Sequence, residues 1–166
     1  MEPSLESSKP SRVLFVCLGN ICRSPAAEAV FQHLVNERGL GEGFVVDSAG
    51  TSSYHIGEPA DKRMRAAASG RGIEVTSRSR MVSPRDFSRF DVLVAMDQDN
   101  YRELHKLAGS SGRKVRLLSD FLDDTWPRDV PDPYYGTDDG FDEVLDMLQA
   151  AAPTMLAEFS RGPKNS

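Results

Sequence analysis

The segment from Val13 to Pro25 constrains the fold more than any other part of this 166-residue chain. Its first four residues, Val-Leu-Phe-Val, are apolar and β-prone, which is typical of a strand covered on both faces. Ser24 is a favourable N-cap and Pro25 suits the first position of a helix, so we expect a helix to begin there. The chain must therefore pass from a buried strand into a helix through one short turn that begins at Cys17 and includes Arg23.

The same alternation of strand and helix patterns continues along the chain. Strands rich in Val, Leu or Phe are predicted at 12–17, 43–48, 91–96 and 114–118. Helical patterns occur at 24–38, 58–70, 97–108 and from about 139, and we expect Pro153 to kink or split the last of them. Such alternation implies right-handed crossovers, which predicts an α/β fold with helices on both faces of a parallel sheet.

Composition places the chain among single-domain proteins. We expect residues 1–11 to be a disordered lead-in and residues 12–162 to form one domain. The net charge of -5 argues against a nucleic-acid surface, and no apolar run reaches transmembrane length. With two cysteines and no signal-peptide pattern, we expect a cytoplasmic protein in a reducing compartment. We also expect either a monomer or a weak homodimer.

The turn itself has the composition of an anion-binding loop. Gly19 and Asn20 tolerate positive φ, which lets successive N–H groups converge on one point. The following helix start adds unpaired N–H groups and the positive end of its dipole, and Arg23 adds a planar guanidinium that matches phosphate oxygens. The predicted phosphate-binding loop comprises Leu18, Gly19, Asn20, Ile21, Cys22 and Ser24.

Cys17 lies at the centre of this predicted positive field. We therefore expect a thiolate there at neutral pH, hydrogen-bonded by Ser24 and able to attack phosphorus, which predicts a phosphate-monoester hydrolase with a cysteinyl-phosphate intermediate. The simpler alternative is that Cys17 is a small core hydrophobe at the end of a strand. For Cys22 two interpretations stay open, since it either packs in the core or traps oxidised Cys17 as a reversible disulfide.

The run Val16-Cys-Leu-Gly-Asn-Ile-Cys-Arg-Ser24 resembles the signature of the low-molecular-weight protein tyrosine phosphatases. The resemblance continues through Asp47-Ser-Ala-Gly-Thr51, Val94-Ala-Met-Asp97 and Asp132-Pro-Tyr-Tyr-Gly136, and it covers about residues 11 to 160. It implies a four-stranded parallel sheet within a three-layer α/β/α fold and a two-step covalent mechanism. It also implies no metal and no cofactor, with a phosphotyrosine-containing protein or peptide as the partner.

A general acid is required to protonate the leaving phenol, and this contributes about 10²–10⁴-fold in rate. Asp132 lies in a proline-rich segment that is too irregular for a helix or strand, where Asp-Pro alone would predict only a turn. The resemblance implies that Asp132 is the general acid and base. Asp129 is the alternative candidate.

Substrate selection must come from the walls of the pocket. Tyr54, Tyr134 and Tyr135 are expected on loops around the site, where their aromatic rings would form a slot deep enough for a phenyl ring. The alternative is that these loop tyrosines only cover helix ends. Ser48 is expected to bond the Asn20 side chain and support the loop. The resemblance places a histidine of animal relatives at Ser77, so a support network that is thinner or bridged by water is predicted in this chain.

Three other functions fit parts of this pattern. A thioredoxin-coupled arsenate reductase shares the loop, but it needs a distal cysteine pair that this chain lacks. A protein-arginine phosphatase carries a small threonine where Ile21 stands. A non-catalytic phosphotyrosine-binding module would not need Cys17, Arg23 and Asp132 together. The histidines His33, His55 and His105 have no metal-like spacing and are expected at the surface or half-buried.

Overall fold

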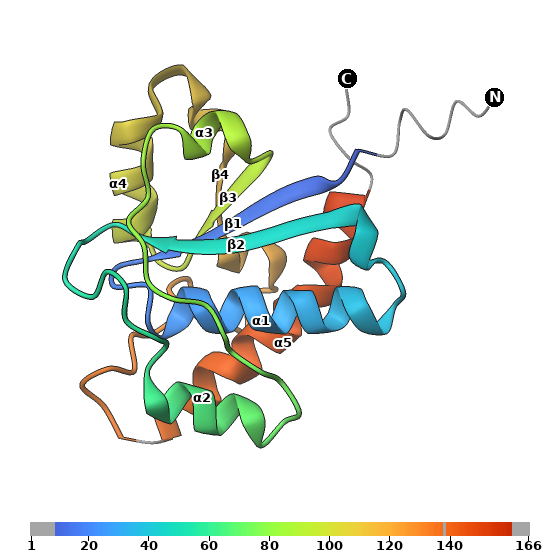
Figure 1. The fold of residues 1–166 in the computed structure, drawn as a ribbon, viewed down its shortest axis with the longest axis vertical. Helices are drawn as coiled ribbons and strands as arrows, with labels where there is room; N and C mark the ends of the chain where they lie inside the picture. The colour runs from blue at the N-terminus through green and yellow to red at the C-terminus, as the bar shows by residue number, and fades with distance from the viewer. Residues whose placement is uncertain (1–8, 138, 161–166) are drawn as a thin grey trace.

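Four parallel strands form one sheet at the centre of the computed structural model, which describes residues 9–137 and 139–160. Their order across the sheet is β2-β1-β3-β4, as Figure 1 shows. The strands are β1 (Ser11–Cys17), β2 (Phe44–Gly50), β3 (Val92–Ala95) and β4 (Val115–Leu117). The apolar run Val13 to Val16 is completely buried, which explains why the first strand of the chain takes an interior position in the sheet.

Helices cover both faces of this sheet, so the fold has three layers (Figure 1). On one side lie α1 (Arg23–Glu37), α2 (Lys62–Ser69) and α5 (Asp139–Ser160). On the other side lie α3 (Asp86–Arg89) and α4 (Gln98–Ala108). Short 3-10 helices connect these elements: η2 (Gly41–Gly43), η3 (Gly109–Lys114) and η4 (Leu118–Phe121). The predicted α/β/α architecture with a four-stranded parallel sheet is confirmed.

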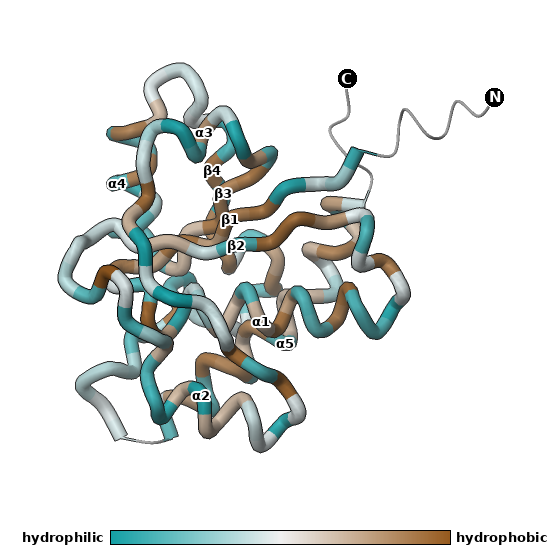
Figure 2. The backbone as a smooth tube through the Cα atoms, in the orientation of Figure 1, coloured by the Kyte–Doolittle hydropathy of each residue, from teal (hydrophilic) through white to brown (hydrophobic). Residues whose placement is uncertain are grey.

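The sheet separates two hydrophobic cores. Because side chains alternate along a strand, Val13 and Phe15 of β1 face the larger core with α1 and α5, whereas Leu14 and Val16 face the smaller core with α4. Phe15 packs on Phe31 in the larger core, and the apolar strands form the hydrophobic centre in Figure 2.

The second helix and the last helix each differ from the prediction in one respect. The second helix begins at Lys62 rather than at 58, because the Asp61 side chain accepts a hydrogen bond from Arg63 N and caps it there. Of the two outcomes expected at Pro153, a split of the last helix is wrong, since α5 continues from Asp139 to Ser160 with Pro153 inside it, and a kink stays a prediction. Apolar side chains on both sides of the proline are buried in the larger core, and this packing offsets the lost backbone hydrogen bond.

The predicted domain limits are only partly within the described residues. β1 begins at Ser11, one residue inside the expected lead-in, and residues 1–8 and 161–162 lie outside the described part of the chain. None of the helices described here is long and apolar enough to cross a membrane.

The carboxyl ends of the strands converge at one edge of the sheet, on the left in Figure 1. β1 there passes into α1, β2 passes into a long loop, and β3 leads to α4. In parallel α/β sheets, ligands bind beyond this edge. The first described strand begins, and the last described helix ends, on the opposite side of the molecule (Figure 1).

Candidate active site

The loop of residues 17–24, called here the 17–24 loop, makes a tight turn at the end of β1. Asn20 has a φ of 56°, so it takes the left-handed conformation predicted for this turn, whereas Gly19 does not. Cys17 O and Leu18 O accept hydrogen bonds from Thr51 N and Ser52 N, at 2.9 and 3.0 Å. The loop is therefore fixed to the chain that follows β2.

Gly50 allows this close approach. It lies opposite Cys17 in the register of β1 and β2, and a Cβ atom there would come within 2.7 Å of Leu18 O and 3.1 Å of the Asn20 Cβ. A side chain at position 50 would therefore displace the 17–24 loop.

The helix after the loop starts differently from the prediction. α1 begins at Arg23, with Cys22 at the N-cap position and no capping side chain, so the expectation that Ser24 caps the helix is wrong. The hydroxyl of Ser24 lies instead 3.1 Å from Cys17 Sγ and accepts a hydrogen bond from Asn20 Nδ2 at 2.8 Å. The Ser24 hydroxyl therefore contacts Cys17 and Asn20 instead of capping α1.

Both cysteines are free and buried, but their surroundings differ. Cys17 Sγ accepts a hydrogen bond from Asn20 N at 3.3 Å in addition to its contact with Ser24. Burial raises the pKa of the Cys22 thiol far above its ordinary value, and the negative charges of Asp61 and Cys17 raise it further. Cys22 therefore stays a neutral thiol at physiological pH.

A network of polar side chains supports the loop from behind. Asn20 Nδ2 donates to Ser48 Oγ at 3.0 Å, as predicted, and Asn20 Oδ1 accepts a hydrogen bond from Arg80 N at 3.0 Å. Ser48 Oγ donates in turn to Glu28 Oε1 at 2.7 Å. Burial raises the pKa of Glu28, while hydrogen bonds from Ser48 and Ser77 act in the opposite direction. Ser77 therefore joins the network through Glu28.

Arg23 is buried at the mouth of the loop, with only 4% of its side chain exposed. Its Nη1 donates to Asp97 Oδ2 at 2.7 Å and to Val130 O at 3.0 Å, and its Nη2 lies 3.6 Å from Asp132 Oδ2. Burial alone would lower the pKa of Arg23, but the negative charges of Cys17, Asp97 and Asp132 more than offset it. The guanidinium is therefore always charged and held in one orientation.

The two candidate acids have different surroundings. Asp132 lies beside Arg23, and its Oδ1 accepts a hydrogen bond from Tyr134 N at 3.1 Å. Asp129 Oδ1 instead accepts hydrogen bonds from Gln98 N and Nε2, at 3.0 and 3.2 Å, at the start of α4. Of the two, only Asp132 lines the pocket above Cys17.

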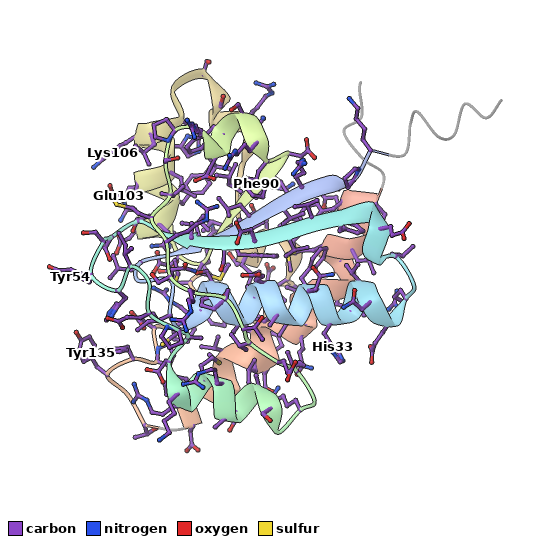
Figure 3. All side chains as sticks on the ribbon, in the orientation of Figure 1. His33, Tyr54, Phe90, Glu103, Lys106 and Tyr135 are labelled. Atoms are coloured by element: carbon purple, nitrogen blue, oxygen red, sulfur yellow. The ribbon has the colours of Figure 1, made fainter. Side chains whose placement is uncertain are left out.

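This pocket, with a volume of about 130 Å³, brings the predicted residues together. Tyr54 and Tyr135 form its outer rim, 85% and 92% exposed, and Figure 3 shows them on neighbouring loops at the same end of the molecule. The residues lining it are Cys17, Leu18, Gly19, Ile21, Cys22, Arg23, Ser52, Tyr54, His55, Asp132, Tyr134 and Tyr135. Asn20, Ser24 and Ser48 lie behind this surface and support it.

Three residues of the site were not predicted from the sequence. Asp97 was noted only in the motif of residues 94–97 and as the first residue of the helix predicted at 97–108. It caps α4 through Asn100 N, and its other oxygen binds Arg23. His55 contacts the loop, so that a Cβ atom on Gly19 would meet its ring at 3.1 Å. Ser52 Oγ is buried at the pocket wall and has no hydrogen-bond partner among the described residues.

Only the motif Val94-Ala-Met-Asp97 gave a signal for any of these three, because it puts a carboxylate at the end of a strand. Within residues 9–137 and 139–160, no three His, Cys, Asp or Glu side chains are placed to hold a metal ion.

The fold and the site define a class of protein: a three-layer α/β protein with a cysteine and an arginine in one tight loop after its first strand. A family model described as low molecular weight phosphotyrosine protein phosphatase matches residues 12–165. The chain belongs to this family, and the family predicted from the sequence is confirmed.

Individual relatives agree with this assignment over most of their length. The low molecular weight protein-tyrosine-phosphatase of Streptomyces coelicolor is 46% identical over 150 residues, which is 88% of this chain and 92% of that protein. The human low molecular weight phosphotyrosine protein phosphatase is 42% identical over 135 residues, 80% of this chain and 85% of that protein. A crystal structure of a protein tyrosine phosphatase from Entamoeba histolytica, with Hepes in its active site, matches with a TM-score of 0.88 and 45% identity. It covers 92% of this chain and 98% of that one.

Proposed function

We propose that this phosphatase hydrolyses phosphotyrosine in proteins or peptides, and small aryl phosphates, through a cysteinyl-phosphate intermediate. The observation that carries the proposal is the convergence of Cys17, Arg23 and Asp132 on one pocket at the end of β1. These three groups supply a nucleophile, an anion clamp and a proton donor within reach of one phosphate ester.

In the first step, Cys17 Sγ attacks phosphorus and the bond from phosphorus to the phenolic oxygen breaks. Asp132, in its acid form, gives its proton to the leaving phenolate, so that a neutral phenol departs. In the second step, Asp132 accepts a proton from a water molecule that attacks phosphorus, the bond between sulfur and phosphorus breaks, and inorganic phosphate is released. Ser24 is placed to stabilise the departing thiolate, since its hydroxyl lies 3.1 Å from the sulfur.

The 17–24 loop and Arg23 stabilise the charge on the transferring group. The N–H group of Asn20 is hydrogen-bonded to Cys17 Sγ, so other N–H groups of the 17–24 loop bind the equatorial oxygens, and the guanidinium of Arg23 adds a fixed positive charge. Because Asp97 and Val130 O hold one end of the guanidinium, the orientation of Arg23 is set before a substrate arrives.

The pocket walls favour a phenyl ring over a short alkyl ester. Tyr54 and Tyr135 at the rim lie where the ring of a phosphotyrosine would pass on its way to Cys17. The shorter side chain of phosphoserine would not extend from this rim to the loop. Ile21 lines the pocket with a bulky apolar side chain, which favours an aromatic ester over phosphoarginine.

The proposal is tested with peptides that carry phosphotyrosine, phosphoserine or phosphoarginine, with orthovanadate as a competing phosphate analogue. We expect release of phosphate from the phosphotyrosine peptide alone, with inhibition by orthovanadate. Cys17→Ser should abolish hydrolysis and retain phosphate binding. Equal or faster release from phosphoarginine would instead assign the chain to the arginine phosphatases, and activity of Cys17→Ser would refute the covalent mechanism.

Asp132 is tested separately. Asp132→Ala should lower kcat/KM for phosphotyrosine about 10²–10⁴-fold and affect kcat/KM for esters of very acidic phenols much less, because those phenols leave without a proton. Unchanged turnover of phosphotyrosine by Asp132→Ala would show that another residue is the acid, and Asp129→Ala is the matched control.

A further inference from the structure

Arg63, at the start of α2, connects the 17–24 loop with the segment that carries Asp132, and it does not line the pocket. Its Nη2 donates to Tyr134 O at 3.0 Å, two residues after Asp132. Its guanidinium also lies over the rings of Phe141 and Tyr134, at 4.7 and 5.6 Å from their centroids. Arg63 thus contacts the main chain, and one ring, of the segment that carries the candidate acid.

Asp61 holds the same guanidinium. Arg63 Nε donates to Asp61 Oδ1 at 3.2 Å and Nη2 donates to Oδ2 at 3.0 Å, a two-pronged pair. Burial works to raise the pKa of Asp61, but the hydrogen bonds from Arg63 lower it below its ordinary value. The aspartate is therefore charged at neutral pH.

Asp61 is in turn anchored to the 17–24 loop. Its backbone N donates to Ile21 O at 2.8 Å. A continuous path therefore runs from the loop through Asp61 and Arg63 to Tyr134 O, and the Asx-type hydrogen bond from Tyr134 N to Asp132 Oδ1 completes it.

We propose that Arg63 is a positioning residue that holds Asp132 at its working position above Cys17, by fixing the main chain of residue 134 to the start of α2. This inference rests on the proposed function, in which Asp132 is the general acid. Proton transfer to a leaving group depends on heavy-atom placement within a few tenths of an ångström, and a 1 Å displacement costs on the order of 10²-fold. The contacts of Arg63 supply that placement from outside the pocket.

The test is a series of aryl phosphates whose phenols range from weakly to strongly acidic. For Arg63→Ala we expect kcat/KM, which reports the steps up to departure of the phenol, to fall about 10- to 100-fold with the weakly acidic phenols and to change little with the most acidic ones. The dependence of kcat/KM on leaving-group acidity should therefore become steeper, while the affinity for inorganic phosphate should stay the same. An equal loss across the whole series would mean a merely structural role and would overturn the inference.

Arg71→Ala is the matched control. Arg71 follows α2 and, like Arg63, reaches α5, where it bonds Asp142, Asp146 and Gln149, but no contact of it with residues 129–136 is described. Its loss should lower stability without changing the leaving-group dependence. A steeper dependence in Arg71→Ala would show that any loosening of α5 displaces the acid, and it would overturn the specific role of Arg63.

Arg63→Lys keeps a positive charge over Phe141 and so tests the inference even if the alanine variant does not fold. A lysine cannot bridge Asp61 and Tyr134 O with one planar group, so we expect an intermediate steepening. A leaving-group dependence of Arg63→Lys identical to that of the unsubstituted protein would count against the inference.

A double-substitution cycle separates this inference from the assignment of the acid. In an Asp132→Ala background, Arg63→Ala should have no further effect on the weakly acidic phenols, because the group that it positions is gone. If Asp132→Ala steepens the leaving-group dependence and Arg63→Ala does not, the inference about Arg63 fails alone. If Asp132→Ala itself leaves the dependence unchanged, the assignment of the acid fails and the inference fails with it.

Discussion

Removal of the Asp97 carboxylate is expected to destabilise the protein strongly, because it leaves Arg23 charged and buried. The Arg23 side chain is 4% exposed and that of Asp97 is 19% exposed, so water replaces the lost partner only in part. Breaking a buried ion pair from one side costs about 3–5 kcal/mol. Asp97 also caps α4 through Asn100 N, and loss of such a cap typically costs about 1 kcal/mol.

Asp97→Ala should therefore lower the free energy of unfolding by about 3–5 kcal/mol, since Val130 O and Asp132 still neighbour the guanidinium and moderate the combined loss. Asp97→Asn keeps the cap and an acceptor for Arg23, so it should cost only about 1–3 kcal/mol, the difference between a charged and a neutral acceptor. Urea unfolding followed by far-ultraviolet circular dichroism measures both values.

Asp99 provides the matched control, because it lies two residues further on in the first turn of α4 and pairs with Arg102 at the exposed surface. Asp99→Ala should cost no more than about 1 kcal/mol. If Asp97→Ala is no more destabilising than Asp99→Ala, then Arg23 does not depend on Asp97. The account of how the guanidinium is oriented would then be refuted.

Three further predictions concern the loop and its support. Gly50→Ala should lower kcat/KM for p-nitrophenyl phosphate about 100-fold, because the added Cβ would displace the 17–24 loop. Gly43→Ala is the control and should not lower it, since a Cβ at Gly43 would meet nothing within 4 Å. Equal activities of the two variants would refute the steric argument. Because the folded-state pKa of Glu28 is raised above 4.5, the folded state holds the proton more tightly, and stability falls as pH rises through the window just above 4.5. Urea unfolding between pH 4 and 7 should show this slope weakened in Glu28→Gln, and an unchanged slope would contradict it. Iodoacetamide at pH 7 should alkylate Cys17 and leave Cys22 unmodified, as peptide mass mapping would show, and preferential labelling of Cys22 would contradict its neutral, buried state.

Much of the architecture could be predicted because its signals are local. The apolar runs that became β1 and β3 need burial on both faces, and the strand-turn-helix of residues 13–25 is encoded in consecutive residues. The composition of the 17–24 loop likewise pointed to an anion site, since its residue types have direct conformational and charge preferences.

The rest depended on contacts between distant parts of the chain. The side chain of Ser24 had a strong local preference for a cap, yet Cys17 and Asn20 engage it instead. Asp97 lies 74 residues from Arg23, and no rule of spacing pairs them. The role of Pro153 was also set by tertiary packing, because burial of the flanking apolar residues outweighs a missing backbone bond.

The location of Tyr54 and Tyr135 has a consequence for how this protein and its relatives can diversify. Both rings project into solvent, whereas the groups beneath them are cross-linked through Asn20 to β2, α1 and the chain at Arg80. Replacement of a solvent-exposed rim residue costs little folding energy, while replacement of an interior hydrogen-bonded group costs much more. The residues at the entrance can therefore change in evolution while the hydrogen-bonded loop beneath them stays constant.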